Sequence, residues 1–206
     1  MTFRASIATP SIVAVAGLVF ALALPAMAQT TTDHLRGKVK SLAGDTLVIQ
    51  PKAGKPVTVK LAAAWSVVLM QPVDPSAIQP GSFIGTTNMK RRDGTGRSLE
   101  VHVFPPGVKM GQGHYPWDLK PHSMMTNGDV GKVVAGSKGR MIEVAYPGGV
   151  RHILVPPNTP VVSTAPGDRA MVKPGVGVFI IPIKAADGTL GADRVVVGLN
   201  GAAPPM

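Results

Sequence analysis

The chain contains no cysteine, and it has few aromatic residues: two Trp, two Tyr and five Phe among 206 residues. The lack of cysteine excludes disulfide bonds, thiol chemistry and Cys-ligated metal sites. Proteins that bind single-stranded nucleic acid need exposed rings on which bases stack. The scarcity of rings therefore predicts no nucleic-acid partner, although the chain is basic.

Acidic residues are also few, with 11 Asp and Glu against 21 Lys and Arg. The sequence has no Gly-x-Ser-x-Gly, no His-Glu-x-x-His, no phosphate-binding loop and no Rossmann glycine pattern. Four aspartates stand where they would cap or form turns, which leaves Glu100, Asp118 and Glu143 for acid–base chemistry. We therefore predict that the protein is not an enzyme.

The N-terminal segment has the pattern of a secretory signal peptide. Arg4 precedes a nearly unbroken apolar run at 12–24, and Ala26-Met27-Ala28 forms a small-residue cleavage site. The run is shorter than the roughly 20 residues of a transmembrane helix, and no later segment approaches that length. We expect cleavage after Ala28, a periplasmic or secreted product without a transmembrane segment, and a flexible N-terminus at 29–33.

Removal of residues 1–28 takes away one cation, Arg4, and no carboxylate, so the net charge of +10 becomes +9. The cations are scattered, and the densest run is at 90–92. One interpretation is a well-solvated surface, and the other is attraction to anionic lipid or polysaccharide of the cell envelope.

The chain matches itself at an offset of 94 residues. Residues 37–103 and 131–197 share 16 identities without a gap, including the Asp-Gly-Thr at 93–95 and 187–189. This predicts an internal duplication, with unit one at 34–104, a connector at 105–127, unit two at 128–199 and a disordered tail at 200–206.

Each unit reads as β structure. Unit one holds six short runs rich in Val, Ile and Thr, at 35–42, 45–51, 56–62, 65–71, 82–89 and 98–104. Asp74 and Asp168 each open a predicted helical turn, and the Asp-Gly pairs predict tight hairpins. The expected fold is all-β, with two tandem small antiparallel barrels of the OB or SH3-like kind joined by an ordered connector.

The connector is the most unusual stretch of the chain. It carries the motif "HYPWDL" at 114–119, in which Tyr115 and Trp117 flank a proline. We predict that these two rings make the connector a structural clasp between the barrels, because buried rings stabilise a small domain.

A second hypothesis for the same region is a copper or zinc site, since imidazole and thioether groups are ligands for these metals. The candidate ligands are His102, which has no counterpart in unit two, and the connector residues Met110, His114, His122, Met124 and Met125. The spacing of these residues is loose, and methionine often fills gaps in apolar packing. His102 shares a strand face with Glu100 and Phe104, so the connector could also simply cover it.

Four segments resemble a group of exported bacterial proteins with duplicated small β domains, some of which carry names linked to metal transport. The segments are "EVHVFPPG", "GQGHYPWDL", "MTNGDV" and "APGDRAMVKPG". The resemblance covers nearly all of the chain after residue 28, and it is most specific at His114 and 116–119. It implies a metal-transport partner but assigns no ligand residues. We therefore expect a periplasmic binding or accessory protein that handles copper or zinc, or else an envelope-associated structural module.

Overall fold

The computed structural model describes residues 34–201 and 203–206. The signal peptide and the flexible N-terminus at 29–33 that the sequence predicts both lie outside the described residues. The described part is 60% β-strand and 5% helix, which confirms the all-β class. No helix in it is long and apolar enough to cross a membrane.

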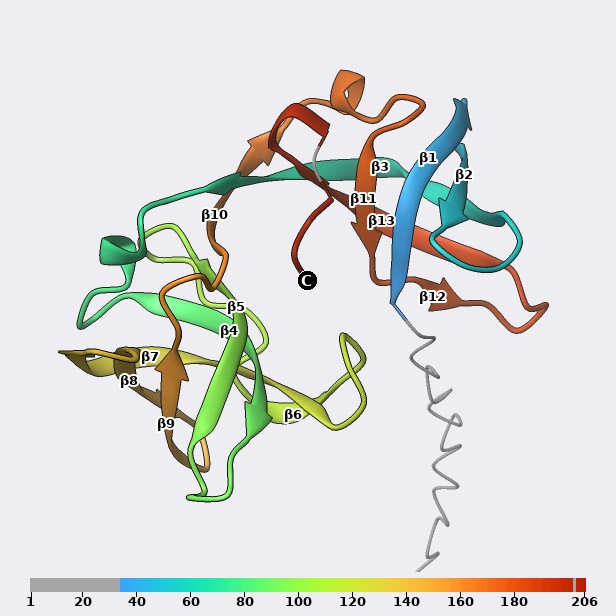
Figure 1. Ribbon diagram of the computed structural model, residues 1–206. Helices are drawn as coiled ribbons and strands as arrows, with labels where there is room; N and C mark the ends of the chain where they lie inside the picture. Colours follow the sequence, from blue (N-terminus) through green and yellow to red (C-terminus); the bar gives the residue numbers. More distant parts are fainter. Residues whose placement is uncertain (1–33, 202) are drawn as a thin grey trace, which may run out of the picture.

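Residues 34–201 and 203–206 form thirteen strands and three single-turn helices (Figure 1). The strands before the middle of the chain are β1 (Leu35–Ala43), β2 (Thr46–Pro51), β3 (Val57–Pro72), β4 (Phe83–Lys90), β5 (Gly96–Val103) and β6 (Gly113–Trp117). The later strands are β7 (Ser123–Gly136), β8 (Gly139–Tyr146), β9 (Gly149–Val155), β10 (Val161–Gly167), β11 (Gly177–Ile180), β12 (Ile183–Lys184) and β13 (Leu190–Gly198). The helices are η1 (Pro75–Ala77), η2 (Arg169–Met171) and η3 (Leu199–Gly201).

The predicted turns are confirmed by their hydrogen bonds. Asp74 and Asp168 cap η1 and η2, each accepting a 2.7 Å hydrogen bond from a backbone N–H two residues further on. Asp93 and Asp187 do the same in the hairpins β4–β5 and β12–β13, at 3.0 and 2.9 Å. Hydrogen bonding in these turns lowers the pKa of Asp74, Asp93 and Asp187 below the ordinary value.

The two strands expected at 56–62 and 65–71 are one strand of 16 residues, β3. The three alanines at 62–64 join them without a glycine or proline that could end the strand. This length lets β3 pair with three other strands, β2, β10 and β13.

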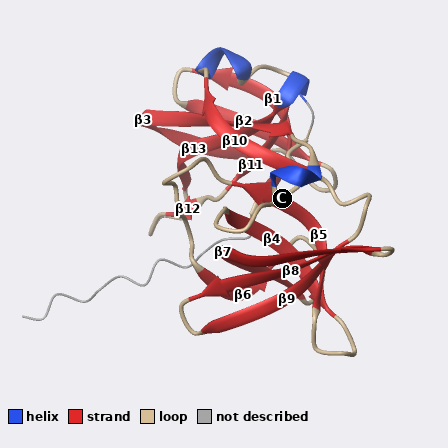
Figure 2. Ribbon diagram, turned by 90° about the vertical axis from the view of Figure 1, so that its left-hand side faces the viewer, coloured by secondary structure: helices blue, strands red, loops and turns tan. Residues whose placement is uncertain are grey.

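Hydrogen bonds connect all the strands into one sheet, which closes on itself twice. One closed set of pairings runs β1–β2–β3–β13–β11 and back to β1; we name it the β1 ring. The other runs β7–β8–β9–β5–β4 and back to β7; we name it the β7 ring. β10 joins the rings by pairing with β3 and β5. Figures 1 and 2 show the two rings as separate lobes.

The expectation of purely antiparallel pairing is wrong in three places. The pairs β3–β13, β5–β9 and β5–β10 are parallel. Parallel neighbours need a long connection, and these pairs join strands from distant parts of the chain.

The hydrophobic cores follow the rings and not the predicted units 34–104 and 128–199. One core combines buried side chains of β1–β3, such as Val39 and Val59, with Val178 and Val195 of β11 and β13. The other core combines buried side chains of β7, β8 and β9 with residues of the first half of the chain, such as Val101 of β5. The β1 ring therefore combines β1, β2 and β3 of the first half of the chain with β11 and β13 of the second half. The β7 ring combines β7, β8 and β9 of the second half with β4 and β5 of the first half.

The connector and the tail both contact the rings. The connector at 105–127 contains β6 and the start of β7, which pairs with β4 from Met124 to Asp129. The tail at 200–206, expected to be disordered, turns back between the rings (Figure 1), and the carbonyl oxygen of Met206 accepts a 2.6 Å hydrogen bond from Arg36 Nε. Apolar contacts of Met206 with buried residues support this course.

Candidate functional site

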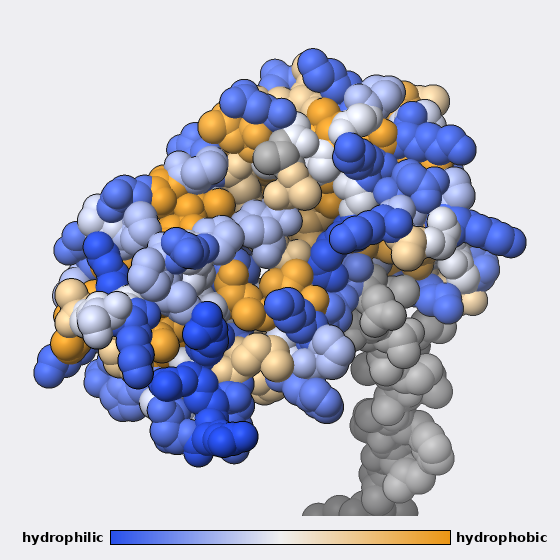
Figure 3. Space-filling view, in the orientation of Figure 1, coloured by the Kyte–Doolittle hydropathy of each residue, from blue (hydrophilic) through white to orange (hydrophobic). Residues whose placement is uncertain are grey.

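A cavity of about 670 Å³ lies between the two rings. Figure 3 shows apolar side chains gathered in this region on the face seen in Figure 1. The apolar lining comes from both rings, the connector and the tail: Val68, Met70, Phe104, Met110, Met125, Phe179, Val196 and Met206. Its volume lies within the range of roughly 300–1,000 Å³ that is usual for small-molecule sites.

Two rows of paired residues face this cavity, one from each ring. In the β7 ring, Gly85 of β4 pairs with His102 of β5 on one side and with Asn127 of β7 on the other. In the β1 ring, Phe179 of β11 occupies the middle, between Val196 of β13 and Arg36 of β1. Directly paired residues project from the same face of a sheet. We name these sets the His102 row and the Phe179 row.

His102 is held by a buried carboxylate. Its Nε2 lies 2.7 Å from Glu100 Oε2, and the two residues are 3% and 0% exposed. Glu100 Oε1 also accepts a 2.8 Å hydrogen bond from the backbone N–H of Thr87. A proton on Nε2, facing this carboxylate, leaves Nδ1 as an acceptor.

The side-chain amide of Asn127 has a defined orientation. Its Nδ2 donates to the carbonyl oxygens of Met110 and Gly111, at 3.2 and 2.9 Å, and to the hydroxyl of Tyr115 at 3.0 Å. Carbonyl oxygens only accept, so the NH₂ group must be on that side. Asn127 Oδ1 then points the other way, and this buried oxygen has no hydrogen-bond partner among the described residues.

Gly85 leaves the space in which these two groups meet. A Cβ atom at this position would lie 2.6 Å from Asn127 Oδ1 and 3.2 Å from His102 Nδ1. Both atoms therefore lie above the same glycine. In the other ring Phe179 fills the corresponding place, with the Arg36 guanidinium 5.1 Å from its ring centre.

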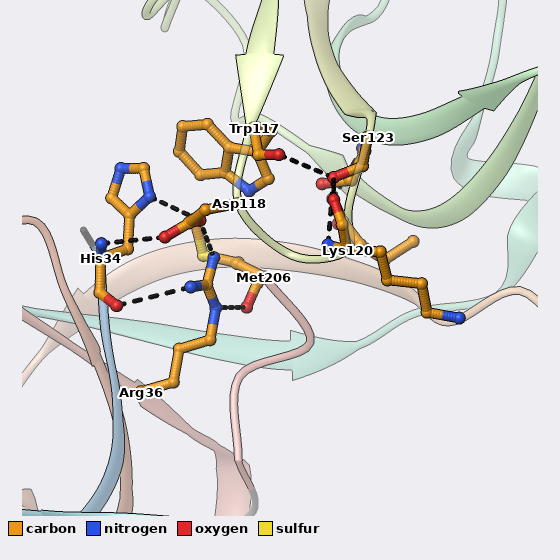
Figure 4. A network of polar contacts seen from close by, with 9 residues as sticks. His34, Arg36, Trp117, Asp118, Lys120, Ser123 and Met206 are labelled. Carbon is orange, nitrogen blue, oxygen red and sulfur yellow. Dashed lines mark hydrogen bonds and ion pairs between the residues drawn. The ribbon is translucent and has the colours of Figure 1, made fainter. Parts of the chain in front are cut away.

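The "HYPWDL" motif attaches the connector to the β1 ring (Figure 4). The Trp117 ring lies 4.1 Å from that of His34 and 6.3 Å from that of Phe179, measured between centroids. The next residue, Asp118, accepts hydrogen bonds from the backbone N–H of His34 at 3.0 Å and from Arg36 Nη2 at 2.6 Å. These contacts join Trp117 and Asp118 to the β1 ring, while Tyr115 contributes its hydroxyl to the Asn127 network.

Ionisation at the clasp reflects its contacts. Burial raises the pKa of Asp118, but hydrogen bonds from Arg36 and His34 outweigh burial and hold that pKa well below its ordinary value. Burial raises the pKa of Tyr115. For His114, burial and then the charge of Arg151 lower the pKa. Asp118 is therefore an anion at any pH near neutrality.

The six candidate metal ligands are not brought to one place. His102, Met110 and Met125 line the cavity, whereas His114, His122 and Met124 are not among its lining residues. Met124 and Met125 are consecutive in a strand and so face opposite sides. In residues 34–201 and 203–206, no group of three or more His, Asp or Glu side chains could hold a metal ion.

His114 and His122 have other surroundings. His114 Nδ1 lies 2.8 Å from Thr126 Oγ1. His122 is exposed in the turn before β7, with a φ of 62°.

Sequence reasoning identified His102 and the connector rings but missed Gly85, Asn127 and Phe179. The only sequence signal for them was position: at the offset of 94, Gly85 stands opposite Phe179 and His102 opposite Val196. A glycine where the other unit has a large ring indicates space that another group fills.

No family model, curated protein or solved structure matches the chain. The description of the site therefore rests on its own geometry.

Proposed function

We propose that this protein is a non-enzymatic binding protein that holds a small, largely apolar molecule in the cavity between its rings. The observation that carries the proposal is the cavity itself: about 670 Å³, lined mainly by apolar residues from both rings. Burial of apolar surface is the main source of affinity in such a site.

Two buried polar atoms on the cavity wall support a ligand role. Asn127 Oδ1 and Trp117 Nε1 belong to residues that line the cavity, and neither has a hydrogen-bond partner among the described residues. A buried polar group without a partner costs roughly 1–3 kcal/mol. A ligand with a few polar atoms would remove that cost, so affinity would arise from the apolar body and orientation from these atoms.

The proposal includes the origin of the fold. We interpret each ring as a small β-barrel, and the two barrels as products of one duplication in which the units exchanged their last two strands. The sequence match at an offset of 94 and the equivalent pairings β1–β11 and β4–β7 support this. The cavity is then the space between two related barrels, in which the His102 row and the Phe179 row have diverged.

We also retain export to the periplasm as a proposal, on the basis of Arg4, the apolar run at 12–24 and Ala26-Met27-Ala28. A binding or accessory role in that compartment fits a ligand that is poorly soluble in water. The copper or zinc hypothesis has less support, because its six candidate residues are dispersed.

Isothermal titration with 2-methoxynaphthalene, an apolar probe without a hydrogen-bond donor, tests the proposed function. The wild-type protein should bind one equivalent with a dissociation constant on the order of 10–100 µM, as expected for about a dozen non-hydrogen atoms. The variant Ala165→Trp, which places an indole in the cavity wall, should lose binding. The control Ala53→Trp, on an exposed loop, should bind like wild type. Wild-type protein that binds no probe, or an Ala165→Trp variant that binds normally, would refute the proposal.

A further inference from the structure

Building on the proposed function, we infer that the ligand carries a hydroxyl or N–H group which donates a hydrogen bond shared by the acceptor pair His102 Nδ1 and Asn127 Oδ1. The apolar body of the ligand then lies toward Phe179. The substrate class is thus an uncharged, mainly apolar molecule with a hydrogen-bond donor at one end.

The first step is that both polar atoms are acceptors. His102 Nε2 lies 2.7 Å from Glu100 Oε2, and a proton on that nitrogen leaves Nδ1 as the acceptor. Three acceptors occupy the NH₂ group of Asn127, which fixes its carbonyl oxygen on the opposite side. The side chains cannot satisfy each other, since two acceptors do not form a hydrogen bond.

The second step is that the two acceptors converge. His102, Gly85 and Asn127 are paired in a row across β5, β4 and β7. Because Gly85 has no side chain, the side chains of His102 and Asn127 can both extend over it. The 2.6 and 3.2 Å distances to a Cβ position on Gly85 place both acceptors around one point. A single donor at the cavity wall can reach this pair.

The third step concerns charge. A metal ion would also accept an imidazole and an amide oxygen, but no third His, Asp or Glu completes such a set in the part of the chain that the structure describes. An ammonium group would have to leave water for a wall of Val, Met and Phe side chains, which is costly for an unpaired charge. Glu100, the carboxylate next to His102, already contacts His102 and Thr87. The carboxylate that lines the cavity, Asp193, lies on the β1 ring beside Arg194 and not at the acceptor pair. A neutral donor avoids both difficulties.

The fourth step is the contrast between the rows. At the places of Gly85 and His102, the β1 ring has Phe179 and Val196, which are 1% and 8% exposed. Arg36 stands where the β7 ring has Asn127, but its guanidinium is engaged with Asp118 and Met206. The His102 row therefore offers polar atoms to the cavity where the Phe179 row offers apolar side chains, which gives a bound molecule a preferred direction.

A matched pair of probes tests this inference: 2-naphthol, which carries a hydroxyl donor, and 2-methoxynaphthalene, which has the same rings and no donor. In isothermal titration of the wild type, 2-naphthol should bind about 10-fold more tightly, the effect of one hydrogen bond to a buried acceptor. His102→Val, which introduces the residue found at 196, should reduce this preference to about threefold or less. Glu100→Gln combined with His102→Val removes the same acceptor without leaving an unpaired carboxylate, and it should behave in the same way.

The outcomes separate the two proposals. Equal affinity of the wild type for both probes would overturn the donor inference and leave the binding cavity in place. Retention of the preference for 2-naphthol in both His102 variants would also overturn it. Failure of both probes to bind the wild type would refute the proposed function and the inference together. His114→Val, a histidine variant outside the cavity, should keep the wild-type preference.

Discussion

Met70 of β3 lies directly opposite Thr164 of β10, and the two residues are 94 positions apart in the chain. The offset of the sequence match is therefore also the separation of a pair at the centre of the sheet. Neighbouring pairs are symmetric about this one, since Val68 pairs with Pro166 and Pro72 with Val162. Met70 and Thr164 both line the cavity, so the proposed site lies where the two rings meet.

Because each ring combines strands from both sides of the connector, a cut in the connector should not separate the two halves. We predict that a protease site inserted between Gly107 and Val108, in an exposed loop, can be cleaved without dissociation. The fragments should elute together on size exclusion in native buffer and separate in concentrated urea. Two independently eluting folded fragments in native buffer would mean that each predicted unit forms its own ring.

Replacement of Trp117 by alanine should destabilise the protein. The ring is partly buried against His34 and Phe179, and burial of a large side chain contributes roughly 1.5–3 kcal/mol. For a chain of this size, that loss corresponds to a fall in melting temperature of about 5–10 °C. Differential scanning calorimetry would measure it, with Trp117→Phe as a control that keeps a ring and loses less. An unchanged melting temperature for Trp117→Ala would refute the clasp hypothesis.

Asp118 should make the free energy of unfolding depend on pH in the acidic range. Its folded-state pKa lies below the ordinary value of about 3.9, so the unfolded chain binds more protons at low pH. Its contribution is therefore fully present above about pH 3.9, and it is lost as the pH falls toward the lower pKa of the folded protein.

The variant Asp118→Asn isolates this effect. It should unfold at a lower temperature than wild type at pH 7, and the difference should shrink as the pH decreases below about 3.9. Thermal unfolding followed by circular dichroism from pH 7 to pH 2.5 measures both proteins under identical conditions. A difference that stays constant down to pH 2.5 would show that the carboxylate of Asp118 has no stabilising ion pair.

Gly85→Ala should be costly, whereas Gly136→Ala should not. A methyl group at 85 would overlap Asn127 Oδ1 and crowd His102 Nδ1, but at 136 it would meet only Gly139 O at an ordinary 3.6 Å. We expect a loss of about 1–3 kcal/mol for Gly85→Ala and less than about 0.5 kcal/mol for Gly136→Ala in urea unfolding. Equal stability of the two variants would indicate that the space above Gly85 is not needed.

The strands could be predicted from sequence because their signals are local. The alternation of Val57, Val59 and Leu61 with polar residues defines one face of β3, and Asp-Gly pairs mark the hairpins. The pairings β3–β13 and β5–β9 could not be predicted, since they join segments far apart in the chain and no local pattern selects their partners.

The candidate site was visible only in part for the same reason. His102 stood out because Val196 replaces it at the offset of 94, and Glu100 lies two residues away on the same strand face. Asn127 lies near His102 only because β4 pairs with both β5 and β7, with Gly85 between the two residues. A connector residue that forms a sheet row with β4 and β5 has no sequence signature.

The most direct test of the account is a crystal structure of the protein with 6-bromo-2-naphthol, in which anomalous scattering locates the bromine. We predict one bromine site inside the cavity, on the side of Phe179 and Met70, and the hydroxyl oxygen within about 3.2 Å of His102 Nδ1 or Asn127 Oδ1. Bromine found only on the outer surface, with the cavity closed by its own side chains, would contradict the central claim that the space between the rings is a ligand site.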